Sequence, residues 1–134
     1  MLFRKPQLRN IHAKIERNVH KTKILHGIFG VRALESGWLT SEQIETLRRS
    51  IKRQLKPKEK IWLRLKPFKV LTGKSRGIRM GKGKGAAKHT VFQTKAGRVL
   101  FEFEMKNRRK KWIKQLNAKS PIQLDLVSNF CFDK

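Results

Sequence analysis

The 134-residue sequence contains a single cysteine, Cys131, and no tyrosine. One cysteine cannot form a disulfide framework, so we expect the chain to fold in a reducing compartment. The four histidines lack the spacing of metal ligands, so neither a structural zinc site nor any cofactor is expected. No apolar run reaches the ~18–20 residues that a membrane-spanning helix requires, and no membrane span is predicted.

Acidic residues are also scarce, with 9 Asp and Glu against 34 Lys and Arg, which gives a formal net charge of +25. Twelve basic residues and no acid lie between positions 60 and 98. A free globular protein with this imbalance would repel itself, so the charge is better explained by a polyanionic partner than by a solvated surface. We expect nucleic acid to be that partner, and we do not expect a homo-oligomer.

The stretch most unlike an ordinary folded segment is residues 73–85, which reads GKSRGIRMGKGKG. It contains no acid and only two apolar side chains, so it buries too little surface to offset the cost of ordering its backbone. Its glycines let main-chain N–H groups come close to phosphates. We interpret this stretch as a finger that inserts into RNA and becomes ordered there. Its candidate RNA-binding residues are Lys74, Arg76, Arg79, Met80, Gly81, Lys82, Gly83, Lys84 and Gly85.

The glycine spacing does not match a nucleotide-binding motif. A P-loop lysine is followed by Ser or Thr, whereas Lys82 and Lys84 are each followed by glycine, and a dinucleotide fingerprint would require glycine where the chain has Ala86. No catalytic set of side chains can be assembled. Glu102 and Glu104, expected on one side of a strand, are read as charges that balance nearby lysines. We therefore predict that the protein is not an enzyme.

Hydrophobic periodicity predicts an α+β fold with a mostly antiparallel sheet and two helices packed on one face. Thr40 and Gln43 form a capping-box pattern for a helix over 40–55, which Pro57 ends. This helix has a core face and a basic face. A turn is expected at residues 35–38, and residues 89–94 and 98–104 are expected to form a hairpin. The further expected elements are strands over 28–34, 60–66 and 122–126 and a helix over 106–119.

The chain divides into a basic N-terminal extension, residues 1–27, and a single α+β RNA-binding domain, residues 28–134, with a protruding loop at 73–88. The extension is expected to thread into folded RNA, although a frayed, solvated terminus would have the same composition. The strand over 60–66 is expected to turn Ile61, Leu63 and Leu65 to the core. Candidate RNA contacts outside the finger are Arg4, Lys5, Arg9, Arg48, Arg49, Lys52, Arg53 and Arg64.

Three blocks resemble the bacterial-type large-subunit ribosomal protein L-sixteen family, its organellar relatives included. They are FGVRAL with LTxxQIExxRRxI within residues 29–51, KIWxR at 60–64, and RMGKGKG at 79–85. With VLFE at 99–102 and KxPI at 119–122, the resemblance covers roughly residues 29–127. It implies roles for residues 79–85 and, more weakly, for Arg48, Arg49, Arg53 and Arg64.

The resemblance implies a structural constituent of the large ribosomal subunit that binds large-subunit rRNA and contacts neighbouring ribosomal proteins. Its RMGKGKG loop would help to shape the aminoacyl and peptidyl tRNA sites near the peptidyl-transferase centre, without chemistry. The alternative is a free-standing non-specific RNA-binding protein or RNA chaperone. A cationic membrane-active protein is disfavoured, because the apolar stripe of the 40–55 helix is narrow.

The chain departs from the family at Trp38, where Arg is usual, and at residues 68–76, where the approach to the finger is usually rich in proline. The N-terminal segment also matches poorly. Heavy use of Lys, Ile and Phe is typical of an AT-rich organellar genome, and residues 1–27 contain no serine and an early Pro6, so no transit peptide is predicted. We expect a mitochondrially encoded protein of the matrix, with the bacterial cytoplasm or a plastid as the alternative.

Overall fold

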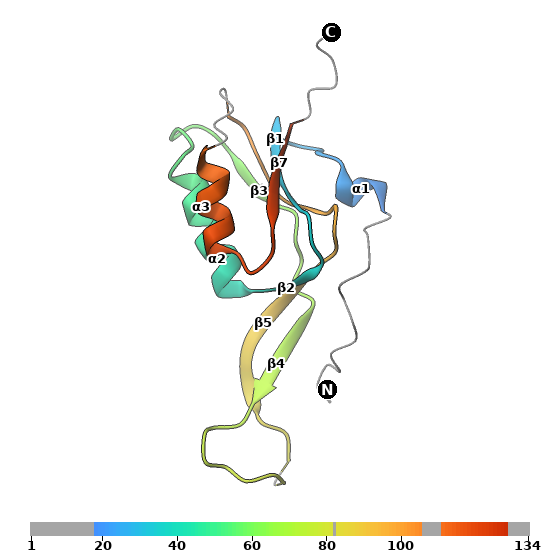
Figure 1. The fold of residues 1–134 in the computed structure, drawn as a ribbon, viewed down its shortest axis with the longest axis vertical. Helices are drawn as coiled ribbons and strands as arrows, with labels where there is room; N and C mark the ends of the chain where they lie inside the picture. The colour runs from blue at the N-terminus through green and yellow to red at the C-terminus, as the bar shows by residue number, and fades with distance from the viewer. Residues whose placement is uncertain (1–17, 82, 106–110, 129–134) are drawn as a thin grey trace.

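The computed structural model describes residues 18–81, 83–105 and 111–128 (Figure 1). The candidate residues Arg4, Lys5, Arg9 and Lys82 lie outside these ranges, as does the first part of the helix expected over 106–119. The elements in order are α1 (Val19–Thr22), β1 (Phe29–Ala33), β2 (Gly37–Thr40), α2 (Ser41–Lys52), β3 (Ile61–Leu63), β4 (Lys69–Gly73), β5 (Ala86–Thr94), β6 (Val99–Phe103), α3 (Lys111–Lys119) and β7 (Leu124–Ser128).

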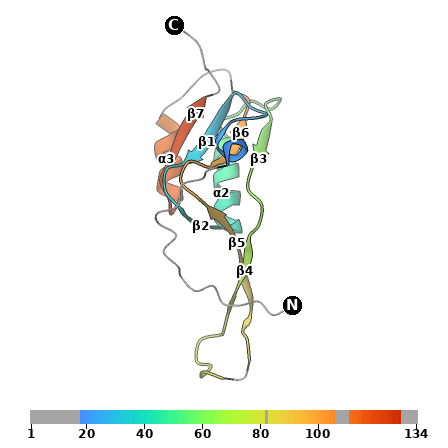
Figure 2. The ribbon, with the colours of Figure 1, turned by 90° about the vertical axis from the view of Figure 1, so that its right-hand side faces the viewer.

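The strands form two antiparallel sheets, so the predicted α+β class is confirmed. One sheet has four strands in the order β3-β6-β1-β7, and the other has three in the order β2-β5-β4. Helices α2 and α3 pack against each other, and α3 also contacts β7 (Figures 1 and 2). The four-stranded sheet and these helices form the body of the molecule, and the three-stranded sheet extends from the body.

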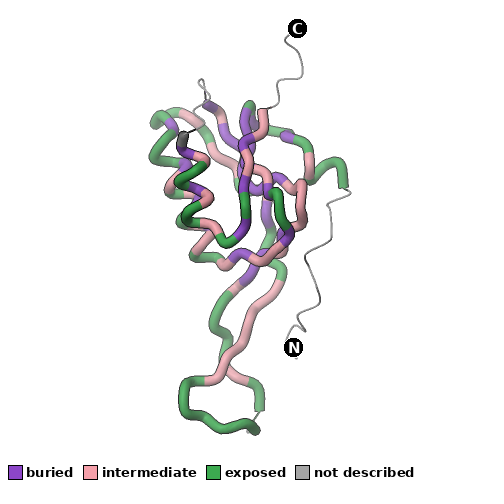
Figure 3. The backbone as a smooth tube through the Cα atoms, viewed as in Figure 1, coloured by how far each residue is buried: buried purple, intermediate pink, exposed green. Residues whose placement is uncertain are grey.

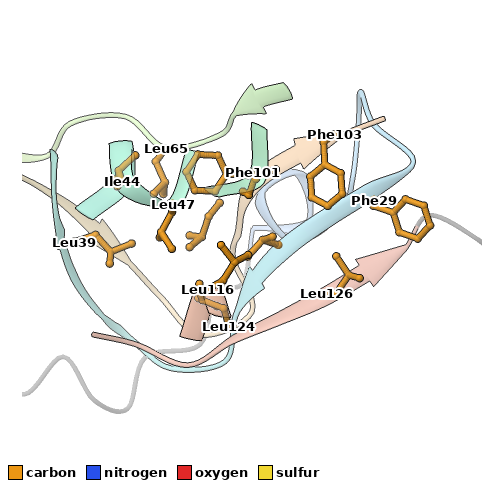
Figure 4. Close-up of a cluster of buried hydrophobic side chains, with 14 of the residues drawn as sticks. Phe29, Leu39, Ile44, Leu47, Leu65, Phe101, Phe103, Leu116, Leu124 and Leu126 are labelled. Atoms are coloured by element: carbon orange, nitrogen blue, oxygen red, sulfur yellow. The ribbon is translucent and has the colours of Figure 1, made fainter. Parts of the chain in front are cut away.

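Helix α2 begins where the capping box predicts. The Thr40 hydroxyl accepts a hydrogen bond from the Gln43 N–H at 3.3 Å, and the Gln43 side chain accepts one from the Thr40 N–H at 2.9 Å. The helix buries Ile44, Leu47 and Ile51 in the main core. That core also contains phenylalanines of the four-stranded sheet and leucines of α3 and β7 (Figure 4).

The hairpin expected between residues 89–94 and 98–104 is wrong. Strand β5 pairs with β2 and β4, whereas β6 pairs with β1 and β3 in the other sheet. The intervening turn is held by the end of β1: Gly97 N–H donates to the Ala33 carbonyl at 2.8 Å, and Ala96 N–H donates to the Ser36 hydroxyl at 2.9 Å. Gly97 has a φ of +89°, a conformation that favours glycine. The short turn therefore passes the chain from one sheet to the other.

The predicted turn over 35–38 is too long, because β2 begins at Gly37 and runs directly into α2. The predicted faces of two strands also differ from those observed. Strand β6 is buried along its whole length, Glu102 included, because it lies between β3 and β1 beneath the packed N-terminal segment. Leu63, expected in the core, is exposed at the sheet edge formed by β3.

The chain leaves the three-stranded sheet through β4 and returns through β5, which together form a hairpin. Their register runs from Lys69 opposite Val91 to Gly73 opposite Ala86, with an irregularity between Leu71 and Thr72. The hairpin projects far from the body, and the connection at its end is exposed along most of its length (Figure 3). Within the described part of the chain, no helix has both the length and the apolarity needed to cross a bilayer.

Candidate nucleic-acid interface

The tip of the hairpin, residues 74–85, joins the paired strands β4 and β5, which we call the stalk, through a narrow neck of glycine backbone. A Cβ atom placed on Gly85 would lie 2.6 Å from the carbonyl carbon and oxygen of Gly73. Real Cβ atoms do not approach backbone that closely, so a side chain at this position would force the two strands apart. The neck therefore requires glycine at position 85, which explains the last glycine of the RMGKGKG block through close packing.

The glycines within the tip serve a different purpose. Gly77, Gly81 and Gly83 have φ angles of +85°, +103° and +82°, which place all three in the left-handed region. A Cβ atom on any of them would meet no atom within 4 Å. Their requirement for glycine is therefore one of backbone conformation, since L-residues with side chains rarely adopt these angles. These left-handed residues turn the chain back on itself in a segment that has no core to hold it.

Two lysines contribute internal contacts to the tip. The Lys74 ammonium donates a hydrogen bond to the Gly81 carbonyl across the loop, and the Lys88 ammonium donates to the Lys74 carbonyl at 3.2 Å. Ile78, Met80 and Gly83 are among the residues that line a hollow of about 430 Å³ between the two sides of the loop. The Lys74 side chain is therefore already engaged in the tip, which makes it a bracing residue as well as a candidate RNA contact.

Arg76, Arg79 and Met80 of the tip are open to a ligand. Arg76 and Arg79 are exposed and make no ion pair with any carboxylate that the structure describes, and Met80 is fully exposed. Lys84 is exposed, and desolvation together with the neighbouring charge of Lys69 lowers its pKa. Like charges held together in this way favour binding of an anion, because an anion relieves their repulsion.

The basic face of α2 is partly neutralised within the helix. Glu45 accepts hydrogen bonds from Arg48 at 2.7 Å and from Arg49 at 3.0 Å. These bonds lower the pKa of Glu45 to about 2 and raise the pKa of Arg48. The Lys52 ammonium donates to the Glu59 carbonyl at 3.2 Å, whereas the exposed Arg53 guanidinium has no contact of this kind in the described chain. Of the four candidates on this helix, Arg53 is the one most available to a phosphate.

Arg64 lies in a different environment from the other candidates, because its guanidinium is mostly buried. It forms an ion pair with Glu102, whose side chain has no exposure, and it donates to the His20 carbonyl at 2.6 Å. The Glu102 carboxylate also accepts hydrogen bonds from the backbone N–H groups of Leu25, His26 and Gly27, at 2.6 to 3.1 Å. The pair therefore fastens the segment before β1 to the sheet.

Glu102 is the important residue that sequence reasoning missed. Strand alternation predicted a surface carboxylate, and no local pattern links it to N–H groups that lie 75 to 77 positions earlier in the chain. The three groups that it binds belong to residues 25–27, which were expected to be part of the N-terminal extension. In the structure, those residues and the buried Ile24 lie against the body.

The candidate residues do not form one continuous site. Helix α2 begins beside the three-stranded sheet and runs away from the hairpin, so the C-terminal end of α2 and the hairpin tip lie at opposite ends of the molecule (Figure 1). Among the described residues, no group of three His, Cys, Asp or Glu side chains could hold a metal ion. The arrangement provides separated cationic contact points on a long, narrow shape, which suits an extended polyanion better than a small substrate.

Comparison with known proteins identifies relatives along almost the whole chain. The family model described as ribosomal protein L16p/L10e matches residues 3–127. Large ribosomal subunit protein uL16c of Cyanidium caldarium is 40% identical over 120 residues, which is 86% of each chain. Large ribosomal subunit protein uL16 of Chlamydia trachomatis serovar D is 53% identical over 76 residues, and that of Chlamydia felis is 52% identical over 81 residues. The matched stretch covers 55% and 59% of these two chlamydial proteins, respectively.

Proposed function

This chain belongs to the ribosomal protein L16p/L10e family and is a structural constituent of the large ribosomal subunit rather than an enzyme; from that premise we propose that its hairpin tip contacts tRNA. In this proposal the body binds large-subunit rRNA, and the tip helps to shape the aminoacyl and peptidyl tRNA sites near the peptidyl-transferase centre. Neighbouring large-subunit proteins complete the set of partners.

The observation that carries the proposal is the tip itself. Its cations project from a loop that stands away from the core and that is shaped by left-handed glycines. A loop with open space around its glycines allows main-chain N–H groups to reach phosphate oxygens, while Arg76 and Arg79 bind them from the side. A surface with this design does nothing for the fold, so its residues are best explained by a ligand.

The body supplies orientation. Phosphate contacts position a protein on RNA without reading sequence, and they release counterions, so the affinity depends on salt. Arg53 is the described residue of α2 best placed for such a contact, and Arg48 and Arg49 can exchange their bonds to Glu45 for bonds to phosphate. Fixing the body in this way sets the direction in which the stiff β4–β5 stalk carries the tip.

A free-standing RNA chaperone would share the charge, but it would not require a loop of defined shape at the end of a stalk. Sedimentation of native particles separates the two functions, because a ribosomal constituent travels with the large subunit at moderate salt. The mitochondrial compartment stays a prediction, since the relatives named above are from Chlamydia species and Cyanidium caldarium.

The test is an Arg79→Ala variant assembled into large subunits, with the rate of aminoacyl-tRNA accommodation measured on complete ribosomes. Loss of one charge-assisted contact is worth about 1.5–3 kcal/mol, so we expect the rate to fall roughly tenfold or more while the protein folds normally. Ser75→Ala, an uncharged change in the same loop, is the matched control. Unchanged accommodation and normal subunit maturation in Arg79→Ala would refute the proposed role of the tip.

A further inference from the structure

A second cationic hollow lies on the body at the base of the hairpin, far from the tip. We call it the basal hollow, and its volume is about 570 Å³. Its lining residues come from α1, the β3–β4 connection and the end of β5 with the β5–β6 turn, three segments that are distant in the sequence. Five of its eight lining residues are cations and none is an acid. The lining residues are Lys21, Arg64, Lys66, Pro67, Phe68, Gln93, Lys95 and Arg98.

The charge in the basal hollow is not neutralised by the part of the chain that the structure describes. Arg64 has its counter-charge in Glu102, but the other four cations form no ion pair with any described carboxylate. Burial and the neighbouring charge of Arg98 lower the pKa of Arg64, which shows that the two guanidinium groups interact. An anion seated between these groups would relieve the repulsion.

Arg98 also has unused hydrogen-bonding capacity. One of its terminal nitrogens donates to the Gln93 carbonyl at 3.3 Å, whereas its Nε–H is buried and has no partner in the structure. A buried donor without a partner is unfavourable, so a small movement of the guanidinium that brings this group to an acceptor gains free energy. The Arg98 guanidinium is therefore already held in place with one donor group unsatisfied.

Phe68 gives the basal hollow an aromatic wall. The residue is 57% exposed, although phenylalanine is a large apolar residue that usually packs into a core. Its backbone is fixed, because the Phe68 N–H donates to the Val91 carbonyl at 2.9 Å and Pro67 restrains the preceding residue. An exposed ring on a fixed backbone, beside uncompensated cations, is the usual composition of a surface that binds unpaired nucleotides.

We propose that the basal hollow binds one unpaired nucleotide of RNA, with its phosphate among Lys66, Lys95 and Arg98 and its base stacked on Phe68. The inference rests on the proposed function only in taking RNA as the partner, and it concerns a surface separate from the tip. An acidic peptide would also satisfy the cations, but it would make no use of the exposed ring. The phenylalanine therefore favours a nucleotide over a carboxylate ligand.

The test measures equilibrium binding of a fluorescein-labelled oligouridine of about eight nucleotides, a length within the site size of single-strand binders, to the full-length protein. Phe68→Leu removes the ring but keeps an apolar side chain and the net charge. We expect it to weaken binding about fivefold or more, since stacking of one base on an aromatic side chain has this magnitude. Lys66→Gln with Lys95→Gln should lower the salt slope of the affinity by about 0.7, the value for one phosphate contact to a single strand.

The matched control is Lys56→Gln with Lys58→Gln, which removes two exposed cations outside the basal hollow. The inference is overturned if this control weakens binding as much as the Lys66 and Lys95 pair, or if Phe68→Leu binds as tightly as the unchanged protein. It is also overturned if an oligo-aspartate of equal charge competes as well as unlabelled oligouridine.

A second readout uses native large subunits. Ultraviolet irradiation should cross-link a nucleotide to the peptide that contains Phe68, and mass spectrometry would detect the adduct. Recovery of this peptide without any attached nucleotide would contradict the stacking. The two proposals fail independently. A cross-link at Phe68 together with normal accommodation in Arg79→Ala would refute only the proposed role of the tip. Slow accommodation in Arg79→Ala without a cross-link at Phe68 would refute only nucleotide binding in the basal hollow.

Discussion

Arg64 and Arg79 are both arginines of a strongly basic chain, yet the structure uses them in opposite ways. Arg64 is mostly buried, and its charge is neutralised by Glu102, which also accepts hydrogen bonds from three backbone N–H groups. Arg79 is exposed on a loop that contains no acid and that touches none of the core. The first arrangement stabilises the fold, whereas the second leaves the charge available to a ligand.

The comparison teaches that charge alone does not identify the interface of such a protein. What distinguishes the two arginines is the presence of a carboxylate within the fold, and the same criterion separates Arg48 and Arg49, which share Glu45, from Arg53. Among the described residues, cations without a carboxylate partner lie at the tip, at the end of α2 and in the basal hollow. Substitutions in the carboxylate-paired sites and in the exposed tip test whether this distinction holds.

The largest effect is expected from Glu102→Gln. An amide cannot replace the counter-charge of Arg64, and breaking a mostly buried ion pair in this way costs about 3 kcal/mol or more. The free energy of unfolding, measured by urea denaturation of the full-length protein, should fall by that amount. Glu104→Gln, one residue beyond the end of that strand and only half-buried, should change it little. Equal losses in the two variants would mean that Glu102 has no special structural role.

A smaller effect, confined to the tip, is expected from Gly81→Val. A β-branched residue at a φ of +103° is strained by about 1–2 kcal/mol, and the open space around Gly81 means that the strain is in the backbone alone. The loop should change shape while the urea midpoint of the body stays the same, and tRNA accommodation should slow more than in Arg79→Ala. Gly81→Asn should recover part of the rate, because asparagine tolerates left-handed angles. Identical rates for the Val and Asn variants would exclude this conformational explanation.

The smallest effect concerns Glu45. Its pKa is about 2 in the folded protein against an ordinary value of 4.5, so the pairing stabilises the fold above pH 4.5 and the benefit is lost as the pH falls toward 2. Because this carboxylate is well exposed, solvent screens the pairs and the loss is small. Glu45→Gln should flatten the pH dependence of thermal stability within that window, and an unchanged pH dependence would mean that the pairing does not stabilise the fold.

Local signals made α2 and the finger predictable from sequence. A capping box joins residues three positions apart, and a glycine-rich basic stretch needs no knowledge of distant contacts to be read as a protruding loop. The same local reasoning failed for the β5–β6 connection, because the short turn with Gly97 is equally compatible with a hairpin and with a change of sheet. Only the pairing of Gly97 with Ala33, a contact across the fold, decides between them.

The missed features all depend on contacts between distant parts of the chain. The sequence predicts a turn at Gly37 and Trp38, the first half of β2, because their strand pairing is with Thr94 and Gln93, more than fifty positions later. Glu102 was read as a surface charge for the same reason. The basal hollow combines three separated segments, so no single stretch of sequence indicates it. The exposure of Phe68 follows from the path between β3 and β4, which periodicity does not determine.

Thr40 belongs to two elements at once, and this has a mechanical consequence. It pairs with Val91 in the three-stranded sheet, and its side chain caps the first turn of α2, so no linker separates this sheet from the helix. A sideways load on the far end of the hairpin therefore reaches the helix through Thr40 and through the direct packing of α2 against β2 and β5. The two ends of the molecule are joined by packed structure rather than by a tether.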